Sequence, residues 1–369
     1  MRILHVDTEK GLRGGQGQVM HLMRGLRDAG VPQVLAARRG EKLLAAALEE
    51  GLDARALWPI PAWAPGAAWQ LRGIIDRFAP TLVHAHSAAA HAIALAALPD
   101  GVPLVVTRRV DFAPRDKAKY SDRRIHWIAI SSGVARVLVD AGVASGRITI
   151  VPSGIDPARA TSAPTGARME LRRSWGVREP GPVVGFVGAY VDHKDPLNLV
   201  EAARAIVEEH PHAIIVLVGE GELRPALEAR AAKLGLKDSI VLAGWRNDIA
   251  ACLSAFDIFV MPSKLEGLCT SLLDAQAAGL PCVATRAGGI PDIIEDKENG
   301  TLVPPQDAAA LATAVIALWK DEARRLRFAA AGPRRVHDHF TVERMVQGTL
   351  EVYREIPRRV VLESMAPAL

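Results

Sequence analysis

Short β-branched runs alternate with helical patterns along this chain of 369 residues, and this alternation constrains the fold more than any other feature. In the first half the runs are residues 3–6, 33–36, 82–85, 104–107, 127–130 and 148–151. In the second half they are residues 183–187, 213–218, 240–242, 258–261, 282–284 and 301–303. Strands that alternate with helices form parallel sheets with helices on both faces. The pattern therefore predicts an α/β protein with two doubly wound, Rossmann-like sheets in tandem.

The two sets of runs are separated by residues 156–181, which are rich in Pro, Ala, Thr and Gly, and we place the interdomain connection there. A chain of this length suits two domains, which we expect over residues 1–165 and 166–344. Residues 342–353 have an amphipathic helical pattern, and we expect a C-terminal helix over 345–369 to pack back on the first domain. Open α/β sheets bind ligands at the carboxyl ends of their strands, so two facing domains predict a binding cleft.

Composition narrows the class of protein. The chain is 49% hydrophobic and 23% charged, which is typical of a globular protein, and its net charge of +4 says little about partners. Its three cysteines form neither a disulfide framework nor a metal-binding spacing, so we interpret them as small buried hydrophobes in a cytoplasmic protein. The N-terminus runs directly into a strand, which predicts no secretory signal. No apolar run is long enough for a membrane-spanning helix.

Segment 262–292 carries the most informative motif. Residues 262–275 follow an apolar strand and enter a helix, and Gly267 lets the backbone approach a ligand closely. A helix N-terminus favours phosphate because its first backbone N–H groups have no partner within the helix. We predict phosphate binding at the N–H and hydroxyl groups of Leu268, Cys269, Thr270 and Ser271. The alternative is a plain strand-to-helix turn in which Thr270 or Ser271 only caps the helix.

Two acidic residues flank this turn. Glu266 precedes the helix and can face a ligand, whereas Asp274 lies one turn inside the helix and can accept hydrogen bonds from a vicinal diol such as a ribose. The alternative is that both acids only complement the helix dipole.

These motifs resemble a known family. Pro262-Ser263, Glu266-Gly267 and Leu273-Asp274-Ala275, followed by GLPCVAT at 279–285 and GGIPD at 288–292, resemble the E-x7-E signature of retaining glycosyltransferases of family four, which have the GT-B fold. The resemblance covers nearly the whole chain. It implies that Glu266 contacts the donor sugar and that Asp274 holds the donor ribose. Asp274 replaces the usual Glu and is one methylene shorter, which alters the fit.

A second motif spans residues 188–196, after the first strand of the second domain. The resemblance implies that Gly188 opens the donor loop and that Lys194 pairs with the donor diphosphate. The family's Arg is replaced by Ala189, and losing one cation weakens leaving-group stabilisation. Arg108, Arg109 and Arg246 are candidate replacements. For Lys194 the alternative is a solvated loop cation.

A third region lies near the expected nucleotide. Gly219 begins a G-x-G turn that matches a family position, although it lacks the third glycine of a dinucleotide fingerprint. Residues 244–248, with Trp245 and Arg246, match the loop that approaches the base. Helix capping is the alternative for the turn, and packing is the alternative for Trp245.

In the first domain, Gly14 and Gly15 follow the first strand and open a helix. They resemble the family loop that lets the backbone approach the diphosphate and the acceptor. The rival hypothesis is an NAD-binding loop, but the run does not supply G-x-G-x-x-G.

His84 and His86 lie at a strand end and share an orientation because alternate strand residues point to one face. The family's His at this place contacts the transferred sugar, so we predict that role for His86 and a structural role for His84. A metal site needs further ligands, and none stands at a suitable spacing, so we predict no metal.

Residues 108–124 form the densest basic run. Arginine recognises phosphate and carboxylate by paired hydrogen bonds, so we predict that this run, with Arg108, Arg109, Arg115, Lys117 and Lys119, faces an anionic or membrane-borne acceptor. The alternative is a solvated loop.

Together these features predict a retaining, metal-independent glycosyltransferase with no cofactor beyond a nucleoside-diphosphate sugar. The acceptor is expected to be a glycan or a lipid-linked sugar of cell-envelope polysaccharide or lipopolysaccharide synthesis. We expect a cytoplasmic protein with peripheral contact to the inner face of the membrane, and no nucleic-acid partner. The alternatives are a nucleotide-sugar 2-epimerase and a non-catalytic nucleotide-sugar-binding protein.

Overall fold

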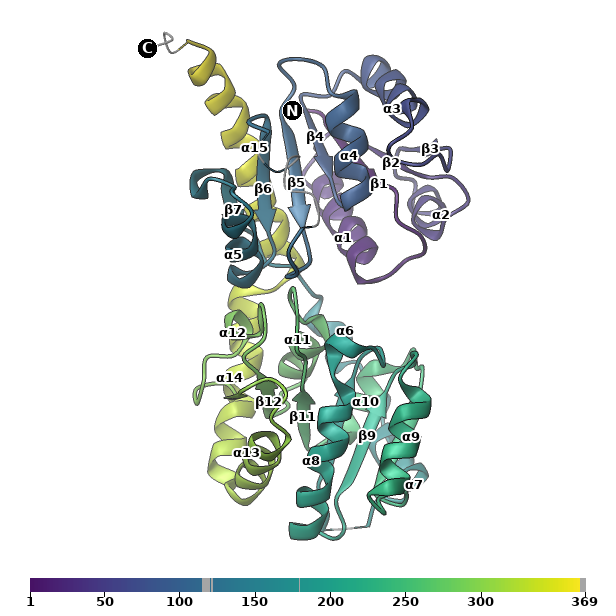
Figure 1. The fold of residues 1–369 in the computed structure, drawn as a ribbon, viewed down its shortest axis with the longest axis vertical. Coiled ribbons are helices and arrows are strands. Elements are labelled where there is room, and N and C mark those ends of the chain that lie inside the picture. The colour runs from purple at the N-terminus through teal and green to yellow at the C-terminus, as the bar shows by residue number, and fades with distance from the viewer. Residues whose placement is uncertain (115–119, 121, 179, 366–369) are drawn as a thin grey trace. The chain divides into compact units, whose positions relative to one another are not determined.

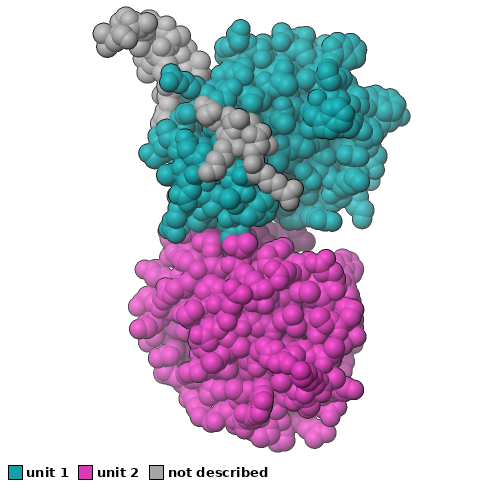
Figure 2. Space-filling view, viewed as in Figure 1, with its two compact units in different colours: residues 1–154, 342–369 teal, residues 155–341 magenta. Residues whose placement is uncertain are grey.

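The structure is a computed structural model that describes residues 1–114, 120, 122–178 and 180–365. It divides into two compact units: unit 1 comprises Met1–Gly154 and Val342–Leu369, and unit 2 comprises Ile155–Thr341 (Figure 2). Unit 1 thus ends before the boundary expected after residue 165, and the chain returns to it at Val342.

The described residues of unit 1 form a seven-stranded parallel sheet in the order β3-β2-β1-β4-β5-β6-β7 (Figure 1). Its strands are β1 (Ile3–Asp7), β2 (Gln33–Arg38), β3 (Ala54–Leu57), β4 (Leu82–Ala85), β5 (Leu104–Arg108), β6 (Ile125–Ala129) and β7 (Ile148–Ile150). Strand β3 was not predicted, because this short edge strand has the sequence ARAL and contains no β-branched residue. The strand order reverses between β1 and β4.

The helices of unit 1 are α1 (Gly14–Asp28), α2 (Lys42–Glu49), α3 (Pro65–Phe78), α4 (Ala88–Ala97), α5 (Ser132–Asp140) and α15 (Val342–Met365). Helix α15 packs against α1, and its Met345, Leu350 and Tyr353 join a core cluster with Ile3 of β1 and Leu82 of β4. Residues from opposite ends of the chain, such as Ile3 and Tyr353, therefore share one hydrophobic core.

The described residues of unit 2 form a six-stranded parallel sheet in the order β10-β9-β8-β11-β12-β13. Its strands are β8 (Val183–Val187), β9 (Ile214–Val218), β10 (Ile240–Gly244), β11 (Ile258–Met261), β12 (Cys282–Thr285) and β13 (Thr301–Val303). Here the strand order reverses between β8 and β11. The predicted fold class, two doubly wound sheets, is confirmed.

Two groups of helices accompany this sheet. In the first, α8 (Pro196–Glu209) packs against α9 (Arg224–Lys233) and α13 (Ala308–Lys320). The second group comprises α6 (Pro157–Thr161), α7 (Ala167–Ser174), α10 (Ile249–Ala255), α11 (Thr270–Ala277), α12 (Ile290–Ile293) and α14 (Glu322–His339). Within the parts of the chain that the structure describes, no helix combines the length and apolarity that crossing a bilayer requires.

Residues 156–181, which composition marked as the interdomain connection, belong to unit 2. Helix α7 packs against α10, and Arg168 and Arg172 both form ion pairs with Asp257, at 2.7 and 2.9 Å. Arg172 also donates to the carbonyl of Ala255 at the end of α10. These arginines anchor a polar segment that carries too few apolar residues to be predicted as part of a core.

Candidate functional site

The topological switch point of unit 2 lies between β8 and β11, where ligands bind in open α/β sheets. Lys194 follows β8 on a short 3-10 helix (Asp192–Lys194), and Glu266 lies in the loop after β11. The sheet order brings these two predicted site residues, 72 positions apart, to the same edge.

Lys194 and Glu266 form an ion pair in which Nζ lies 2.5 Å from Oε2, and their side chains are 17% and 10% exposed. The buried Ser263 hydroxyl donates to the same Glu266 oxygen at 3.3 Å. The Glu266 backbone carbonyl accepts a hydrogen bond from Gly289 N–H at 2.8 Å. Two contacts therefore hold the Glu266 carboxylate and a third holds its backbone, which is the preorganisation that a ligand-binding charge requires.

A second pair of contacts ties the same two loops together. Lys264 donates from its backbone N–H to the His193 carbonyl at 2.9 Å, and its Nζ lies 2.8 Å from Asp192. These contacts join the loop after β8 to the loop after β11 on either side of Lys194 and Glu266.

Helix α11 begins beside Glu266. The cap residue Cys269 makes no side-chain capping bond within the described structure, and the first turn carries no acid, so the N-terminal N–H groups can receive an anion. Leu268 and Cys269 are buried, whereas Thr270 and Ser271 are partly exposed. Burial raises the pKa of the Cys269 thiol to about 11, so it stays protonated at neutral pH.

Asp274 lies one turn inside α11 and is partly buried. Burial raises the pKa of its carboxyl to about 6, although the charge of Arg159 on α6 acts in the opposite direction. Its side chain makes no hydrogen bond in the described part of the protein. A poorly solvated carboxylate without a partner is suited to accept hydrogen bonds from a ligand.

The glycines near this edge have a packing role. Gly219 follows β9 with φ of 146°, and a Cβ on it would lie 1.9 Å from the Gly188 carbonyl oxygen. Only glycine lets these two loops meet. Arg246, a candidate replacement for the missing family Arg, is engaged by Asp248 through contacts of 2.8 and 2.5 Å. Trp245 is 73% exposed and does not pack in a core.

Unit 1 gathers three histidines at its own switch point, between β1 and β4. His5 Nδ1 lies 3.0 Å from His86 Nε2, and His5 is directly opposite His84 in the strand register. His84 bonds Tyr353 Oη through Nδ1 at 2.5 Å and Thr107 Oγ1 through Nε2 at 2.7 Å. Burial lowers the pKa of His5 to about 3 and the pKa values of His84 and His86 well below their usual value, so all three are neutral.

Sequence reasoning missed His5, which comes from a different strand than the H-x-H motif. Ligand nitrogens of His5, His84 and His86 all lie within 4.8 Å of one another, a set that could hold a metal ion. The H-x-H spacing on β4 alone did not reveal this set, because its third member, His5, comes from β1. Both His84 nitrogens are already hydrogen-bonded, so a metal would have to displace Tyr353 or Thr107.

The glycine turn and the basic run of unit 1 meet at Arg109. Gly15 opens α1 together with Gly14, and a Cβ on Gly15 would lie 3.5 Å from Cδ of Arg109. Burial lowers the pKa of Arg109 to about 10, which still leaves it charged at neutral pH. Arg108 instead is buried and donates to Tyr120 Oη at 2.7 Å and to the Phe112 carbonyl, so its guanidinium holds its own loop. Arg115, Lys117 and Lys119 lie outside the described residues.

Two family models match the chain. Residues 12–159 match the family described as Glycosyltransferase Family 4, and residues 167–335 match the one described as Glycosyl transferases group 1. The chain is 29% identical over 260 residues to the UDP-Gal:alpha-D-GlcNAc-diphosphoundecaprenol alpha-1,3-galactosyltransferase of Escherichia coli, covering 65% of this chain and 67% of that protein. It is 33% identical over 219 residues to the 2-deoxystreptamine glucosyltransferase of Streptomyces kanamyceticus, covering 58% and 56%. The matched stretch thus spans between about half and two thirds of these relatives.

Two solved structures share the fold at 20% identity. A glycosyltransferase from Rickettsia africae ESF-5 superposes with a TM-score of 0.86 over 96% of this chain and 98% of its own. Anabaena Alr3699/HepE in complex with UDP superposes with a TM-score of 0.85 over 96% and 100%. The protein is a glycosyltransferase with the GT-B fold. Within that class it carries a Glycosyltransferase Family 4 domain followed by a group 1 domain.

Proposed function

We propose that this protein transfers a sugar, with retention and without a metal, from a nucleoside-diphosphate sugar to a glycan or lipid-linked acceptor. One observation carries the proposal: the Lys194–Glu266 ion pair stands at the β8/β11 switch point beside the N-terminus of α11. A cation, a helix N-terminus and a carboxylate in one place suit a diphosphate that leaves a sugar.

Lys194 and the α11 N–H groups near Thr270 are assigned to the departing diphosphate. As negative charge grows on the leaving oxygen, Lys194 can shift from Glu266 to the phosphate, since the two oxygens compete for the same Nζ. Gly267 leaves room for the backbone to approach the phosphates. The Asp274 carboxylate is assigned to the ribose diol.

Glu266 is assigned to the transferred sugar, where its carboxylate orients hydroxyls or supports positive charge on the anomeric carbon. Retention fits attack by the acceptor on the face that the diphosphate leaves, so that no enzyme nucleophile is needed. Unit 1 supplies His86, whose neutral imidazole can exchange hydrogen bonds with sugar hydroxyls without adding charge. Arg109 is assigned to an anionic group of the substrate.

The relatives suggest a substrate class. The E. coli relative is named for a UDP-Gal donor and a diphosphoundecaprenol-linked sugar, and a Rhizobium meliloti relative, 33% identical over 176 residues, is named as a lipopolysaccharide core biosynthesis glycosyltransferase. We therefore propose that the acceptor of this protein belongs to the cell envelope. We also propose that the protein acts at the inner face of the cytoplasmic membrane.

Calorimetric titration with UDP, GDP and ADP tests the proposal. The wild-type protein should bind one of them, and Lys194→Gln should weaken binding about 10- to 100-fold, because a charge-assisted hydrogen bond contributes about 1.5–3 kcal/mol. Lys233→Gln, an exposed lysine on α9 of the same unit, is the matched control. If no nucleotide binds, the proposal fails. Conversion of a free nucleotide sugar without acceptor would instead identify a 2-epimerase, and binding without turnover would identify a non-catalytic binding protein.

A further inference from the structure

An uncharged, tryptophan-rich segment of unit 1 has no role in the proposed site. Residues 56–71, which run from β3 into α3, contain no charged side chain. Three of the chain's seven tryptophans lie here, and Trp58, Trp63 and Trp69 are 58%, 86% and 79% exposed. Leaving large apolar side chains in water is unfavourable, so their accumulation on one segment indicates a surface that another molecule covers.

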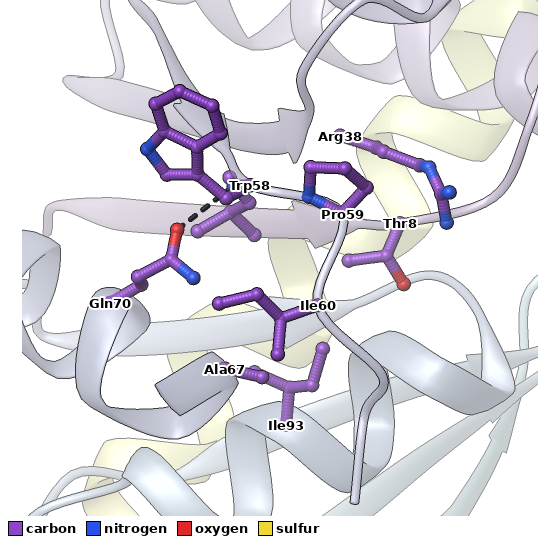
Figure 3. A pocket seen from close by; sticks show the side chains of 9 residues that line it. Thr8, Arg38, Trp58, Pro59, Ile60, Ala67, Gln70 and Ile93 are labelled. Carbon is purple, nitrogen blue, oxygen red and sulfur yellow. Dashed lines mark hydrogen bonds between the residues drawn. The ribbon is translucent and has the colours of Figure 1, made fainter. Parts of the chain in front are cut away.

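The segment is held by a buried anchor and not by its tryptophans. Ile60 lies toward the buried Ala67 and Ile93, whereas the Trp58 indole is directed away from them (Figure 3). The Trp58 backbone N–H donates to Gln70 Oε1 at 2.8 Å, which ties the start of the segment to α3. The fold therefore fixes the backbone and leaves the indoles outside the core.

The segment offers a partner almost no hydrogen-bonding side chain. Gln70 is its only polar residue besides the tryptophans. Its Oε1 accepts from the Trp58 N–H, and its Nε2 donates to the Gly66 carbonyl at 3.4 Å. A protein interface carries about one hydrogen bond per 100–200 Å². A surface of indoles, prolines and small apolar side chains instead suits the headgroup boundary of a bilayer, where tryptophan is enriched.

Cations without a counter-charge border the segment. The Arg39 guanidinium, on the loop after β2, lies over the Trp58 ring at 4.0 Å from its centroid. Lys42 opens α2 after the same loop and is exposed. Neither cation forms an ion pair with any residue that the structure describes. The one acid of this loop, Glu41, accepts instead from the Gly11 N–H at 2.8 Å. Unpaired cations beside exposed indoles match a surface that carries negative charge.

We infer that residues 58–69 insert into the headgroup region of an anionic bilayer, with the indoles of Trp63 and Trp69 at its boundary with the acyl chains and with Arg39 and Lys42 against the lipid phosphates. Insertion to about 5–10 Å anchors a protein to a membrane without spanning it. The inference rests on the proposed function, because it names the surface by which the protein reaches a lipid-linked acceptor.

A second copy of this chain fits the segment less well. In a two-fold symmetric dimer the same surface patch meets itself, so each copy would bring its own Arg39 and Lys42 to the contact. Like charges at a contact repel one another, and the segment itself supplies no acid to offset them. An anionic membrane covers the indoles and neutralises these cations at the same time.

Vesicle sedimentation with the full chain tests the inference. The wild-type protein should bind vesicles of equal parts phosphatidylcholine and phosphatidylglycerol more tightly than vesicles of phosphatidylcholine alone. The double variant Trp63→Ala, Trp69→Ala should weaken that binding at least about tenfold, because two large apolar side chains no longer leave water. Trp245→Ala, which removes a similarly exposed tryptophan of unit 2, should leave vesicle binding unchanged. Thermal unfolding of each variant checks that the fold is kept.

A second pair of substitutions tests the charges. Arg39→Gln together with Lys42→Gln should lower binding to the mixed vesicles about tenfold, because each basic side chain near an anionic surface contributes to the attraction. Binding to phosphatidylcholine alone should change little. Raising the salt concentration should weaken the wild-type protein more than this double variant.

Three outcomes overturn the inference. They are a wild-type protein that does not bind the mixed vesicles, a tryptophan double variant that binds them as well as the wild type, and a wild-type dimer in analytical ultracentrifugation that this variant loses while vesicle binding persists. Calorimetry with UDP, GDP and ADP is read separately. A protein that binds a nucleotide but no vesicle loses only this inference, and one that binds vesicles but no nucleotide loses only the proposed function.

Discussion

The Nδ1 atom of His84 on β4 lies 2.5 Å from the phenolic oxygen of Tyr353 on α15, although the two residues are 269 positions apart. Both side chains are buried, and the His84 Nε2 atom is held in turn by Thr107. This hydrogen bond joins the returning C-terminal helix to the sheet beside the three histidines of unit 1.

Tyr353→Phe should therefore destabilise unit 1 by about 1–3 kcal/mol, because it leaves a buried imidazole nitrogen without its partner. Urea unfolding monitored by circular dichroism measures the change. Gln347→Ala, at an exposed position of the same helix, should change stability by less than about 0.5 kcal/mol. An equal effect of the two substitutions would contradict a specific role for the Tyr353 hydroxyl.

Glu266→Gln should separate binding from transfer. The substitution removes the carboxylate that holds Lys194, so the affinity for the nucleoside diphosphate should stay the same or rise, whereas kcat with a nucleotide-sugar donor should fall about 100-fold or more. Calorimetry and a transfer assay measure the two quantities. Glu298→Gln, an exposed acid of the same unit, is the control. Parallel loss of affinity and turnover would show that Glu266 serves only to build the site.

Asp274 should make nucleotide binding depend on pH. Its pKa is raised to about 6, so on acidification through pH 6 the carboxylate that we propose accepts from the ribose diol becomes neutral, and affinity should fall. Above pH 6 the carboxylate is charged and affinity is complete. Titrations from about pH 5 to about pH 8 measure this, and the difference between wild type and Asp274→Asn isolates Asp274 from the phosphate's own titration. Identical pH profiles for the two proteins would remove Asp274 from the ribose site.

Asp257→Asn should destabilise unit 2 by about 2–3 kcal/mol. One Asp257 carboxylate oxygen accepts from Arg172 and from the Val183 N–H, at 2.9 and 2.8 Å, and the other accepts from Arg168. The amide would present an N–H₂ group to donors, and the buried Arg172 would lose its counter-charge. Urea unfolding measures the loss, with the exposed Asp238→Asn as control. Retained stability would mean that apolar packing alone holds α7.

Local patterns predicted most strands and the fold class, but they failed where the signal is not local. Strand β3 lacks β-branched residues and is ordered by its pairing with β2, and α7 is held by ion pairs that composition does not reveal. Among the candidate site residues, Glu266 and Asp274 could be selected from the sequence, because the motif spacing identifies them. The engagement of Arg108 by Tyr120, and of Arg246 by Asp248, was not predictable, because long side chains can reach several partners.

The sequence by itself determined the α/β alternation, the two-sheet organisation and the E-x7-D spacing of Glu266 and Asp274, because strand and helix periodicity and motif spacing are properties of neighbouring residues. Only the tertiary structure decided that Lys194 pairs with Glu266, that His5 joins His84 and His86, and that α15 returns to unit 1. These relationships depend on strand order and register, which arise when distant segments bury their apolar faces together.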